Sequence, residues 1–212
     1  VVNVREEQFD GSLVAEAAVF SSATLHEAAG QTGALPHVIK PLVDSMRVCG
    51  PALTVQGAPG DNLWLHRAIA QARSGEVLVV AVGGAHEFGY WGGIMTTASL
   101  ARGLGGLVIE GCVRDSDELA TSGFPVFSCG RAIRGTTKVV DAAGHVSQPI
   151  VIGDITVASG DLVVGDADGV VVLARDSVQE VLAAARAREK KEASIAGALR
   201  QGRTTLEVYG WE

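Results

Sequence analysis

The sequence predicts an α/β domain with a largely parallel central sheet, and three observations favour this class. Short apolar runs alternate with helical segments through the centre of the chain, as in consecutive strand–helix–strand units. Two of these runs, 76–82 and 106–109, are apolar on both faces, which is typical of parallel strands covered by helices. The 212 residues are 47% hydrophobic and 19% charged, a composition that suits a globular protein with a substantial core. We expect one domain over residues 1–212, because no repeat or linker interrupts the chain.

The expected elements are bounded by capping and turn residues. Thr24 is placed to cap a short helix that ends at Gly30, and residues 47–56 are compatible with a strand. The turn at 59–62 precedes an amphipathic helix. The central unit is then expected to run as helix 63–73, strand 76–82, helix 94–102, strand 106–109, helix 114–122 and strand 125–128.

In the last third of the chain the sequence pattern changes from alternating strands and helices to short strands. Residues 138–157 and 161–174 hold β-branched runs separated by glycines, which predicts antiparallel hairpins. Within them, Asp166 and Asp168 are expected to shape a turn. A long helix is expected to begin at Asp176-Ser177 and to end near Arg200, with one apolar face and a charged stretch.

Charge and cysteine content exclude several classes of function. The chain has 17 Lys and Arg against 24 Asp and Glu, a net charge of −7, and no basic block, so we expect no nucleic-acid partner. It shows no leader pattern and no apolar stretch near the ~20 residues of a membrane span. We therefore predict a cytoplasmic protein without a membrane partner. Cys49, Cys112 and Cys129 lack metal-binding spacing and lie in apolar surroundings, which favours unreactive buried thiols.

A glycine-rich loop follows the strand at 76–82 and ends in Gly92, Gly93, Ile94 and Met95, where the next helix begins. The N–H groups of a first helical turn have no internal partner, and the helix dipole favours an anion there. An anion site and a tight turn without a ligand are both compatible with this segment. The lysine of a P-loop is missing, which argues against a nucleoside triphosphate.

Charged residues follow the next strand. If Asp115 opens a helix, Asp115 and Glu118 lie on one face, where two carboxylates suit a hard divalent cation. The simpler alternative is a group of first-turn acids that only stabilises the helix. Arg114 beside them favours a site, because a guanidinium can bind a carboxylate and oppose developing negative charge. The histidines lack zinc spacing; His66 is expected to be structural, whereas His86 in the loop is a weaker candidate for a ligand contact.

These two segments share a known spacing. Gly93, twenty residues, Arg114-Asp115, two further residues and Glu118 match the pattern G-x20-R-D-x2-E/D. The chain thereby resembles the family of the regulator of ribonuclease activity A and the related 4-hydroxy-4-methyl-2-oxoglutarate/4-carboxy-4-hydroxy-2-oxoadipate aldolases. The resemblance covers most of the chain, through segments at 23–28, 59–62, 92–93, 106–115, 123–126, 160–162 and 166–170.

The resemblance implies a swivelling-type β/β/α layered domain, with a central mixed sheet and flanking helices, that assembles as a homotrimer or hexamer. It implies a class II pyruvate aldolase in which Asp115 binds Mg²⁺ or Mn²⁺ and Glu118 supports the metal. Arg114 would contact the 2-oxo acid substrate, which the backbone of Gly92, Gly93, Ile94 and Met95 would bind. Glu192, on a C-terminal helix at about 176–202 that reaches a neighbouring subunit, would hold metal-bound water, with Glu189 as the alternative.

The resemblance leaves the substrate and one rival function open. Aldolases of the protocatechuate and gallate pathways carry Asp where this chain has Gly93, whereas Gly93 with Glu118 is the variant of the regulator-like branch. We expect cleavage of a 4-hydroxy-2-oxo acid to pyruvate, with oxaloacetate decarboxylation as a side activity. The alternative is a non-catalytic protein that binds a ribonuclease. A quinone-pathway methyltransferase is disfavoured, because no nucleoside-binding pattern follows the first strand.

Overall fold

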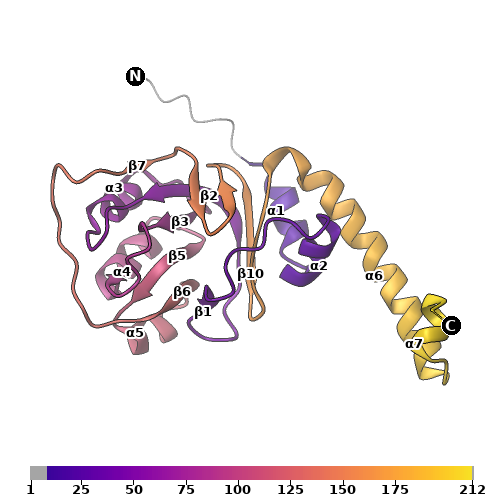
Figure 1. Cartoon of the computed structure of the whole chain (residues 1–212). Coiled ribbons are helices and arrows are strands. Elements are labelled where there is room, and N and C mark those ends of the chain that lie inside the picture. The colour runs from indigo at the N-terminus through magenta and orange to yellow at the C-terminus, as the bar shows by residue number, and fades with distance from the viewer. Residues whose placement is uncertain (1–8, 212) are drawn as a thin grey trace.

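A strongly twisted mixed sheet forms the centre of the computed structural model, which describes residues 9–211 (Figure 1). Its strand order is β1-β6-β5-β3-β2-β10-β11, with β4 beside β5 and β7 beside β2, while β8 and β9 form a separate hairpin. The strands are β1 (Lys40–Pro41), β2 (Val48–Gln56), β3 (Val77–Ala81), β4 (Gly89–Trp91), β5 (Gly106–Val113), β6 (Val126–Arg131), β7 (His145–Val146), β8 (Ile150–Ile152), β9 (Ile155–Val157), β10 (Leu162–Asp166) and β11 (Gly169–Leu173). The helices are α1 (Gly11–Ala17), α2 (Ser22–Ala28), α3 (Leu63–Gln71), α4 (Gly93–Ala101), α5 (Ser116–Thr121), the 3₁₀ turn η1 (Arg175–Ser177), α6 (Val178–Arg200) and α7 (Thr205–Tyr209).

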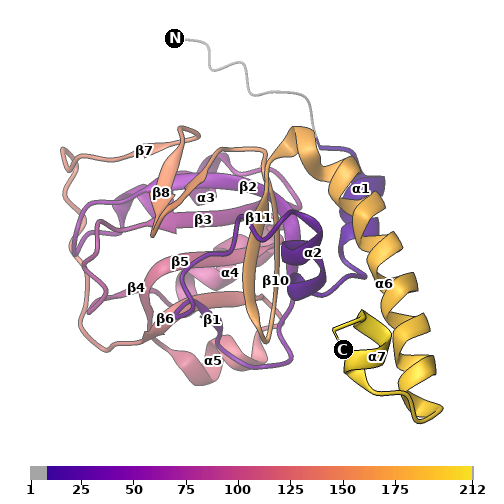
Figure 2. The ribbon, with the colours of Figure 1, turned by 45° about the vertical axis from the view of Figure 1, so that its right-hand side comes forward.

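The predicted parallel centre is confirmed. Strands β2, β3, β5 and β6 pair in parallel, and β10–β11 add an antiparallel hairpin at the edge of β2. In Figure 2, β10 and β11 run across the direction of β2 and β3, so the sheet curls around its own interior. Together with the flanking helices this is the layered α/β architecture that the sequence indicates.

Side-chain alternation along the strands separates the core into layers. On β3, Leu78 and Val80 pack under α3, α4 and α5, while Val77 and Val79 face the β8–β9 hairpin. The outer faces of β10 and β11 are covered by α1, α2 and the first half of α6. Both faces of the central strands are therefore buried, which explains their continuous apolar sequences.

Four expectations about local boundaries were wrong. The helix expected after Thr24 begins earlier, because the Ser21 side chain is the cap and accepts the Thr24 N–H at 3.0 Å. The helix expected from Arg114 begins at Ser116. The glycine-rich loop contains the short strand β4, and the strand expected over 106–109 continues to Val113.

The long C-terminal helix begins two residues later than expected, after the 3₁₀ turn, and ends at Arg200. None of the helices within residues 9–211 has the length and apolar character needed to cross a membrane. The expected domain of 1–212 includes residues 1–8 and 212, which lie outside the described part of the chain.

Asp166 shapes its turn as expected and also ties α2 to the sheet. Its carboxylate accepts the Asp168 N–H at 3.0 Å, the Ser22 N–H at 2.8 Å and the Ser22 hydroxyl at 2.6 Å. Burial raises the pKa of this carboxyl, but these hydrogen bonds and nearby Arg47 outweigh burial and leave the pKa below its usual value. The charged form is thus stabilised by folding.

Asp166→Asn is expected to lower the free energy of unfolding at pH 7 by about 2 kcal/mol, the scale of hydrogen bonds to a charged group. Because the folded pKa is lowered, this stabilisation is present above the unfolded pKa of about 3.9 and is lost as pH falls through the folded pKa. Urea unfolding at pH 7 and pH 3 measures the difference. Exposed Asp168→Asn is the matched control, and equal effects of the two variants at pH 7 would contradict the assignment.

Candidate active site

Two predicted motifs meet because β4 pairs with β5. Trp91, at the end of β4, is aligned with Val113 at the end of β5, and the Arg114 N–H donates to the Trp91 carbonyl at 2.8 Å. Both strands run in the same direction, so their carboxyl ends lie at one edge of the sheet, where α/β folds place ligand sites. The segment that starts α4 and the segment Arg114-Asp115 therefore lie side by side.

The first turn of α4 is capped from the neighbouring segment. Gly92 is its N-cap and has no side chain to accept a helix N–H, and the Gly93 N–H donates instead to Asp115 Oδ2 at 3.0 Å. The amides of Ile94 and Met95 belong to the same first turn, where a helix has no internal acceptor. Met95 is buried, whereas the Ile94 side chain is 84% exposed, which leaves this helix end accessible.

Both glycines leave room for the close approach of the two carboxylates. A Cβ on Gly92 would lie 2.3 Å from Asp115 Oδ2, and a Cβ on Gly93 would lie 2.2 Å from Glu118 Oε2. Glu118 therefore stands where a side chain at position 93 would begin. Glycine at 93 thus leaves the space that the Glu118 carboxylate occupies.

Asp115 has a backbone conformation that few non-glycine residues adopt. Its φ of 56° and ψ of 39° are left-handed, and it precedes α5 without capping that helix through its side chain. Its carboxylate is turned to α4 instead, with Oδ2 3.8 Å from Arg114 Nε. Such strained positions persist where the surroundings hold them, and they concentrate at functional sites.

Arg114 is half-exposed and bordered by the loop after β6. A Cβ on Gly89 would lie 3.0 Å from Arg114 Cβ, and one on Gly135 would lie 3.8 Å from its Nη1. The Gly89 N–H donates to the Arg134 carbonyl at 2.8 Å, which fixes that loop beside the guanidinium. The half-exposed Arg114 side chain thus lies beside Asp115, between the end of β5 and this loop.

The donor set fits a cation that keeps much of its water. Among residues 9–211 no group of three or more His, Cys, Asp and Glu side chains is arranged to hold a metal. Asp115 and Glu118 nevertheless bring two carboxylates to one helix end. Mg²⁺ is commonly held by one or two carboxylates and several waters, so these residues are compatible with it.

Glu192 is not brought to this site within one chain. It lies on the outer half of α6, which projects from the side of the molecule away from α4 and α5 (Figure 1). Its Oε1 accepts from Arg188 Nε at 2.8 Å, and its side chain is 49% exposed. Glu189 lies on the same helix. Any role at the site for either residue requires a second subunit.

Asn62, in the turn at 59–62, contacts the first turn of α4 and was not singled out as a candidate from the sequence. Its Nδ2 donates to the Tyr90 carbonyl at 2.9 Å and reaches Met95 Sδ at 3.5 Å, while its buried Oδ1 has no hydrogen-bond partner among the described residues. The Tyr90 hydroxyl accepts the Gly60 N–H at 2.8 Å, which joins the turn to β4. The turn at 59–62 therefore forms the floor under the start of α4.

Within residues 9–211 the histidines and cysteines noted in the sequence form no hydrogen bond or ion pair with Arg114, Asp115 or Glu118. His86 Nε2 lies 3.8 Å from Glu110 Oε1, and Glu110 Oε2 accepts the Val82 N–H at 3.3 Å. Burial lowers the pKa of His66, as its expected structural place implies. The three cysteines are free and half-buried; burial raises the pKa of Cys49 and Cys129 to about 11 and also raises that of Cys112. Thiols that rarely ionise at neutral pH are poor nucleophiles.

Comparisons with known proteins point to one family. A family model described as RraA-like, Aldolase/RraA, matches residues 13–172, which include the whole candidate site but not α6. The chain is 32% identical over 175 residues, 82% of each chain, to a Halalkalibacterium halodurans protein provisionally named 4-hydroxy-4-methyl-2-oxoglutarate aldolase.

Two solved structures are similar over nearly the whole chain. An uncharacterised protein from Pseudomonas syringae pv. tomato is 34% identical with a TM-score of 0.81, over 96% of this chain and 100% of that one. Streptomyces coelicolor RraAS2, described as an unusual member of the RNase ES inhibitor RraA protein family, is 26% identical with a TM-score of 0.80, over 94% and 100%.

Proposed function

The chain belongs to the RraA-like family, and from that membership we propose that it is a divalent-metal-dependent (class II) pyruvate aldolase. Its substrate would be a 4-hydroxy-2-oxo acid of the 4-hydroxy-4-methyl-2-oxoglutarate type. The observation that carries the proposal is the convergence of Arg114, Asp115 and Glu118 on the first turn of α4. The left-handed backbone of Asp115, a conformation that concentrates at functional sites, supports the same proposal.

The binding groups follow from the charge of a 2-oxo acid. The substrate carboxylate would accept hydrogen bonds from the amides of Gly92, Gly93, Ile94 and Met95, where the helix dipole also favours an anion. Asp115 and Glu118 would hold Mg²⁺ or Mn²⁺ together with water. When bound, the metal would act as a Lewis acid toward the 2-oxo group.

Arg114 would act on the charge that develops during cleavage. A base removes the proton of the 4-hydroxyl, the C4–O bond becomes a carbonyl, and the electron pair of the C3–C4 bond moves onto the pyruvate half. The guanidinium opposes this negative charge, and water then protonates C3 to give pyruvate. Loss of carbon dioxide from oxaloacetate leaves the same charge on the same three carbons, so oxaloacetate decarboxylation is the expected side activity.

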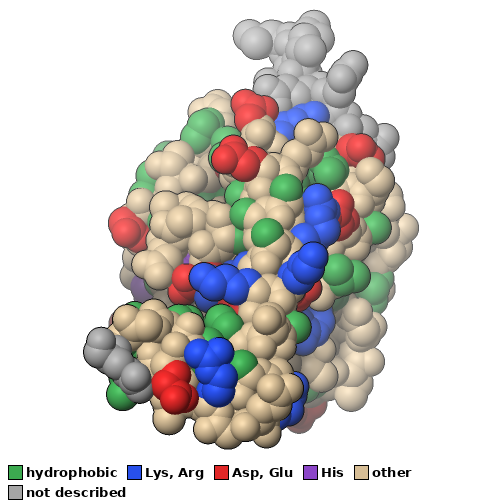
Figure 3. Space-filling model, turned by 90° about the vertical axis from the view of Figure 1, so that its right-hand side faces the viewer, with side chains coloured by type: hydrophobic (Ala, Val, Ile, Leu, Met, Phe, Trp, Pro, Cys, Tyr) green, Lys and Arg blue, Asp and Glu red, His purple; other side chains and the backbone are tan. Residues whose placement is uncertain are grey.

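The arm formed by α6 would complete the site in a homotrimer or hexamer. Lys and Arg side chains lie along this helix (Figure 3), and they belong to Arg186, Arg188, Lys190, Lys191 and Arg200. Arg186 and Arg188 pair with Glu16 and Glu27 of the same chain, so Lys190, Lys191 and Arg200 are the basic residues of α6 that would meet the acidic surface of a second copy. Glu192 of that copy, or Glu189, would then hold the water that serves as the base.

Subunit mixing tests the shared site. Asp115→Ala and Glu192→Ala are each expected to lose activity, because each removes one half of a site built from two chains. Mixed oligomers should regain some activity, because one type of mixed interface pairs an intact Asp115 with an intact Glu192. The rate is measured after subunit exchange confirmed by native mass spectrometry. Failure to complement in confirmed mixed oligomers would place Glu192 outside the neighbouring site.

A non-catalytic regulator of a ribonuclease is the second candidate, favoured by the description of the Streptomyces relative as a ribonuclease inhibitor family member. Pyruvate release separates the two functions. The protein is incubated with a panel of 4-hydroxy-2-oxo acids and with oxaloacetate, with Mg²⁺ or Mn²⁺ or with chelator, and pyruvate is measured. The aldolase proposal expects metal-dependent pyruvate release that chelator abolishes. No pyruvate from any substrate would favour the regulator.

A further inference from the structure

The turn at 59–62 is joined to the segment that borders Arg114. Residues 132–144 form a strap that connects β6 to β7 along one side of the molecule (Figure 1). The family resemblance picks out the turn, yet the proposed reaction uses no residue of it. Its contacts with the strap indicate a role for Asp61.

The Asp61 carboxylate clamps the strap. It is 3% exposed, and its Oδ2 accepts the Val139 N–H at 2.6 Å and the Thr137 hydroxyl at 2.9 Å. Its Oδ1 accepts the Leu63 N–H at 2.8 Å, where α3 begins. One buried carboxylate therefore caps α3 and ties the strap to the turn.

Backbone hydrogen bonds extend the clamp. The Thr137 N–H donates to the Gly60 carbonyl at 2.8 Å, and the Asn62 N–H donates to the Thr137 carbonyl at 3.1 Å. The turn is itself fixed to β4, because the Gly60 N–H donates to the Tyr90 hydroxyl at 2.8 Å. The strap is thus held to a turn that lies beneath the start of α4.

The beginning of the strap forms a wall beside Arg114. The Ala132 N–H donates to the Val113 carbonyl at 2.9 Å, which starts the strap next to this residue. A Cβ on Gly135 would lie 3.8 Å from Arg114 Nη1. Gly135 is two residues before Thr137, so the wall and the clamp belong to one short stretch of chain.

The clamp depends on the charged form of Asp61. Burial raises the pKa of this carboxyl, but hydrogen bonds from Leu63, Val139 and Thr137 and the charge of Lys138 outweigh burial and leave the pKa below its usual value. Both carboxylate oxygens accept a backbone N–H. An asparagine amide would therefore place an NH₂ group against one of these donors, whichever way it turned.

We propose that Asp61 is a positioning residue that acts through the strap: it holds the strap against the turn and thereby keeps the Arg114 guanidinium oriented. The inference rests on the proposed function, in which Arg114 opposes the charge of the cleavage step. A group with this role acts best when it is fixed before the reaction. A displacement of about 1 Å caused by a distant change can lower a rate by as much as about a hundredfold.

Two variants loosen the clamp. Asp61→Asn should lower kcat for metal-dependent pyruvate formation by about tenfold or more, with a smaller change in KM. Thr137→Val removes one hydroxyl donor, keeps the side-chain shape and leaves the bond from Leu63 to Asp61 intact, so kcat should fall several-fold. Both are assayed at a temperature at which circular dichroism shows them to be folded.

Asp166→Asn is the matched control for the loss of a buried carboxylate. Asp166 is 4% exposed and, like Asp61, accepts two backbone N–H groups and one hydroxyl. It lies on β10 and makes these bonds to α2 and its own turn. This variant should lower the melting temperature but leave kcat unchanged.

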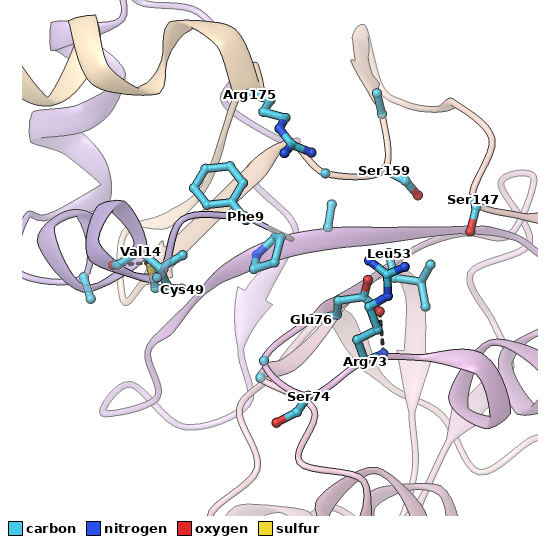
Figure 4. A pocket seen from close by; sticks show the side chains of 18 of the residues that line it. Phe9, Val14, Cys49, Leu53, Arg73, Ser74, Glu76, Ser147, Ser159 and Arg175 are labelled. Carbon is cyan, nitrogen blue, oxygen red and sulfur yellow. Dashed lines mark hydrogen bonds between the residues drawn. The ribbon is translucent and has the colours of Figure 1, made fainter. Parts of the chain in front are cut away.

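Ser159→Ala is the matched control for the loss of a hydroxyl. Ser159 Oγ accepts the Thr54 N–H at 3.1 Å, and it lines a cavity of about 640 Å³ (Figure 4). Glu76 and Gly105 line this cavity just before β3 and β5, whereas Arg114 follows β5. The control therefore lies at the opposite end of the central strands, and its kcat should match that of wild type.

A double variant tests whether Asp61 acts through Arg114. In an Arg114→Lys background, Asp61→Asn should lower kcat no further, because the group that it positions is already lost; a general structural role would multiply the two losses. Hydrogen–deuterium exchange of strap peptides should rise in Asp61→Asn and Thr137→Val but not in Asp166→Asn.

Three results would overturn the inference: a wild-type kcat in both clamp variants, multiplied losses in the double variant, or unchanged exchange of the strap. Its failure can be told from that of the proposed function. An inactive wild type would overturn the aldolase proposal and this inference with it, whereas an active wild type with unaffected clamp variants would overturn this inference alone.

Discussion

Asp115→Asn is expected to reduce metal-dependent pyruvate formation by on the order of a hundredfold or more, the scale for losing a key ligand or charge-stabilising group. Asparagine tolerates the left-handed backbone that Asp115 adopts, and its Oδ1 can still accept the Gly93 N–H. The variant therefore removes the negative charge while keeping the local fold. The experiment measures kcat as a function of Mg²⁺ or Mn²⁺ concentration, with the melting temperature as a check on folding.

Asp117→Asn is the matched control for this variant. Asp117 lies two residues further, in the first turn of α5, and is exposed like Asp115, but only the Asp115 carboxylate accepts the Gly93 N–H. If the first-turn acids act only by stabilising the helix, the two variants should behave alike. Equal activity of Asp115→Asn and Asp117→Asn across the metal titration would remove Asp115 from the site.

Arg114→Lys is expected to lower kcat by about a hundredfold, the usual loss when one group that stabilises transition-state charge is removed. The positive charge is kept, but the ammonium cannot reproduce the planar fork of the guanidinium. Arg134→Lys is the control, because Arg134 lies in the adjoining loop, where it pairs with Glu87 at 3.5 Å and covers the Phe88 ring. Arg114 would have no special role if the two variants lost equal activity at saturating substrate.

The central strands and helices could be predicted because local patterns encode them. Continuous apolar runs indicated β3 and β5, and both proved to be buried on both faces. β4 was missed, because three residues in a glycine-rich loop form a strand only through pairing with β5, which is a contact between distant segments. α7 was also missed, although Thr204 and Glu207 form a capping box that the sequence could have revealed.

The grouping of the candidate residues could be anticipated from the segments that the family resemblance picks out, whereas their roles remain predictions. The family resemblance implied that Gly93, Arg114, Asp115 and Glu118 share a site, and the pairing of β4 with β5 is the reason that their segments meet. Asn62 could not be found in this way, because its place depends on how a turn packs beneath a helix. Glu192 rests on the family resemblance alone, since contacts between chains leave no local pattern in one sequence.

The most direct test of metal-dependent pyruvate chemistry avoids the unknown acceptor. Removal of a proton from the methyl group of pyruvate is the reverse of the protonation step and is common to every substrate of such an aldolase. Pyruvate is incubated with the protein in D₂O, and loss of the methyl proton signal is followed by NMR with Mg²⁺, with Mn²⁺ and with chelator. The account predicts exchange that requires the metal and that Asp115→Asn and Arg114→Lys each reduce severely. Exchange that is absent with metal, or unchanged by both variants, would contradict it.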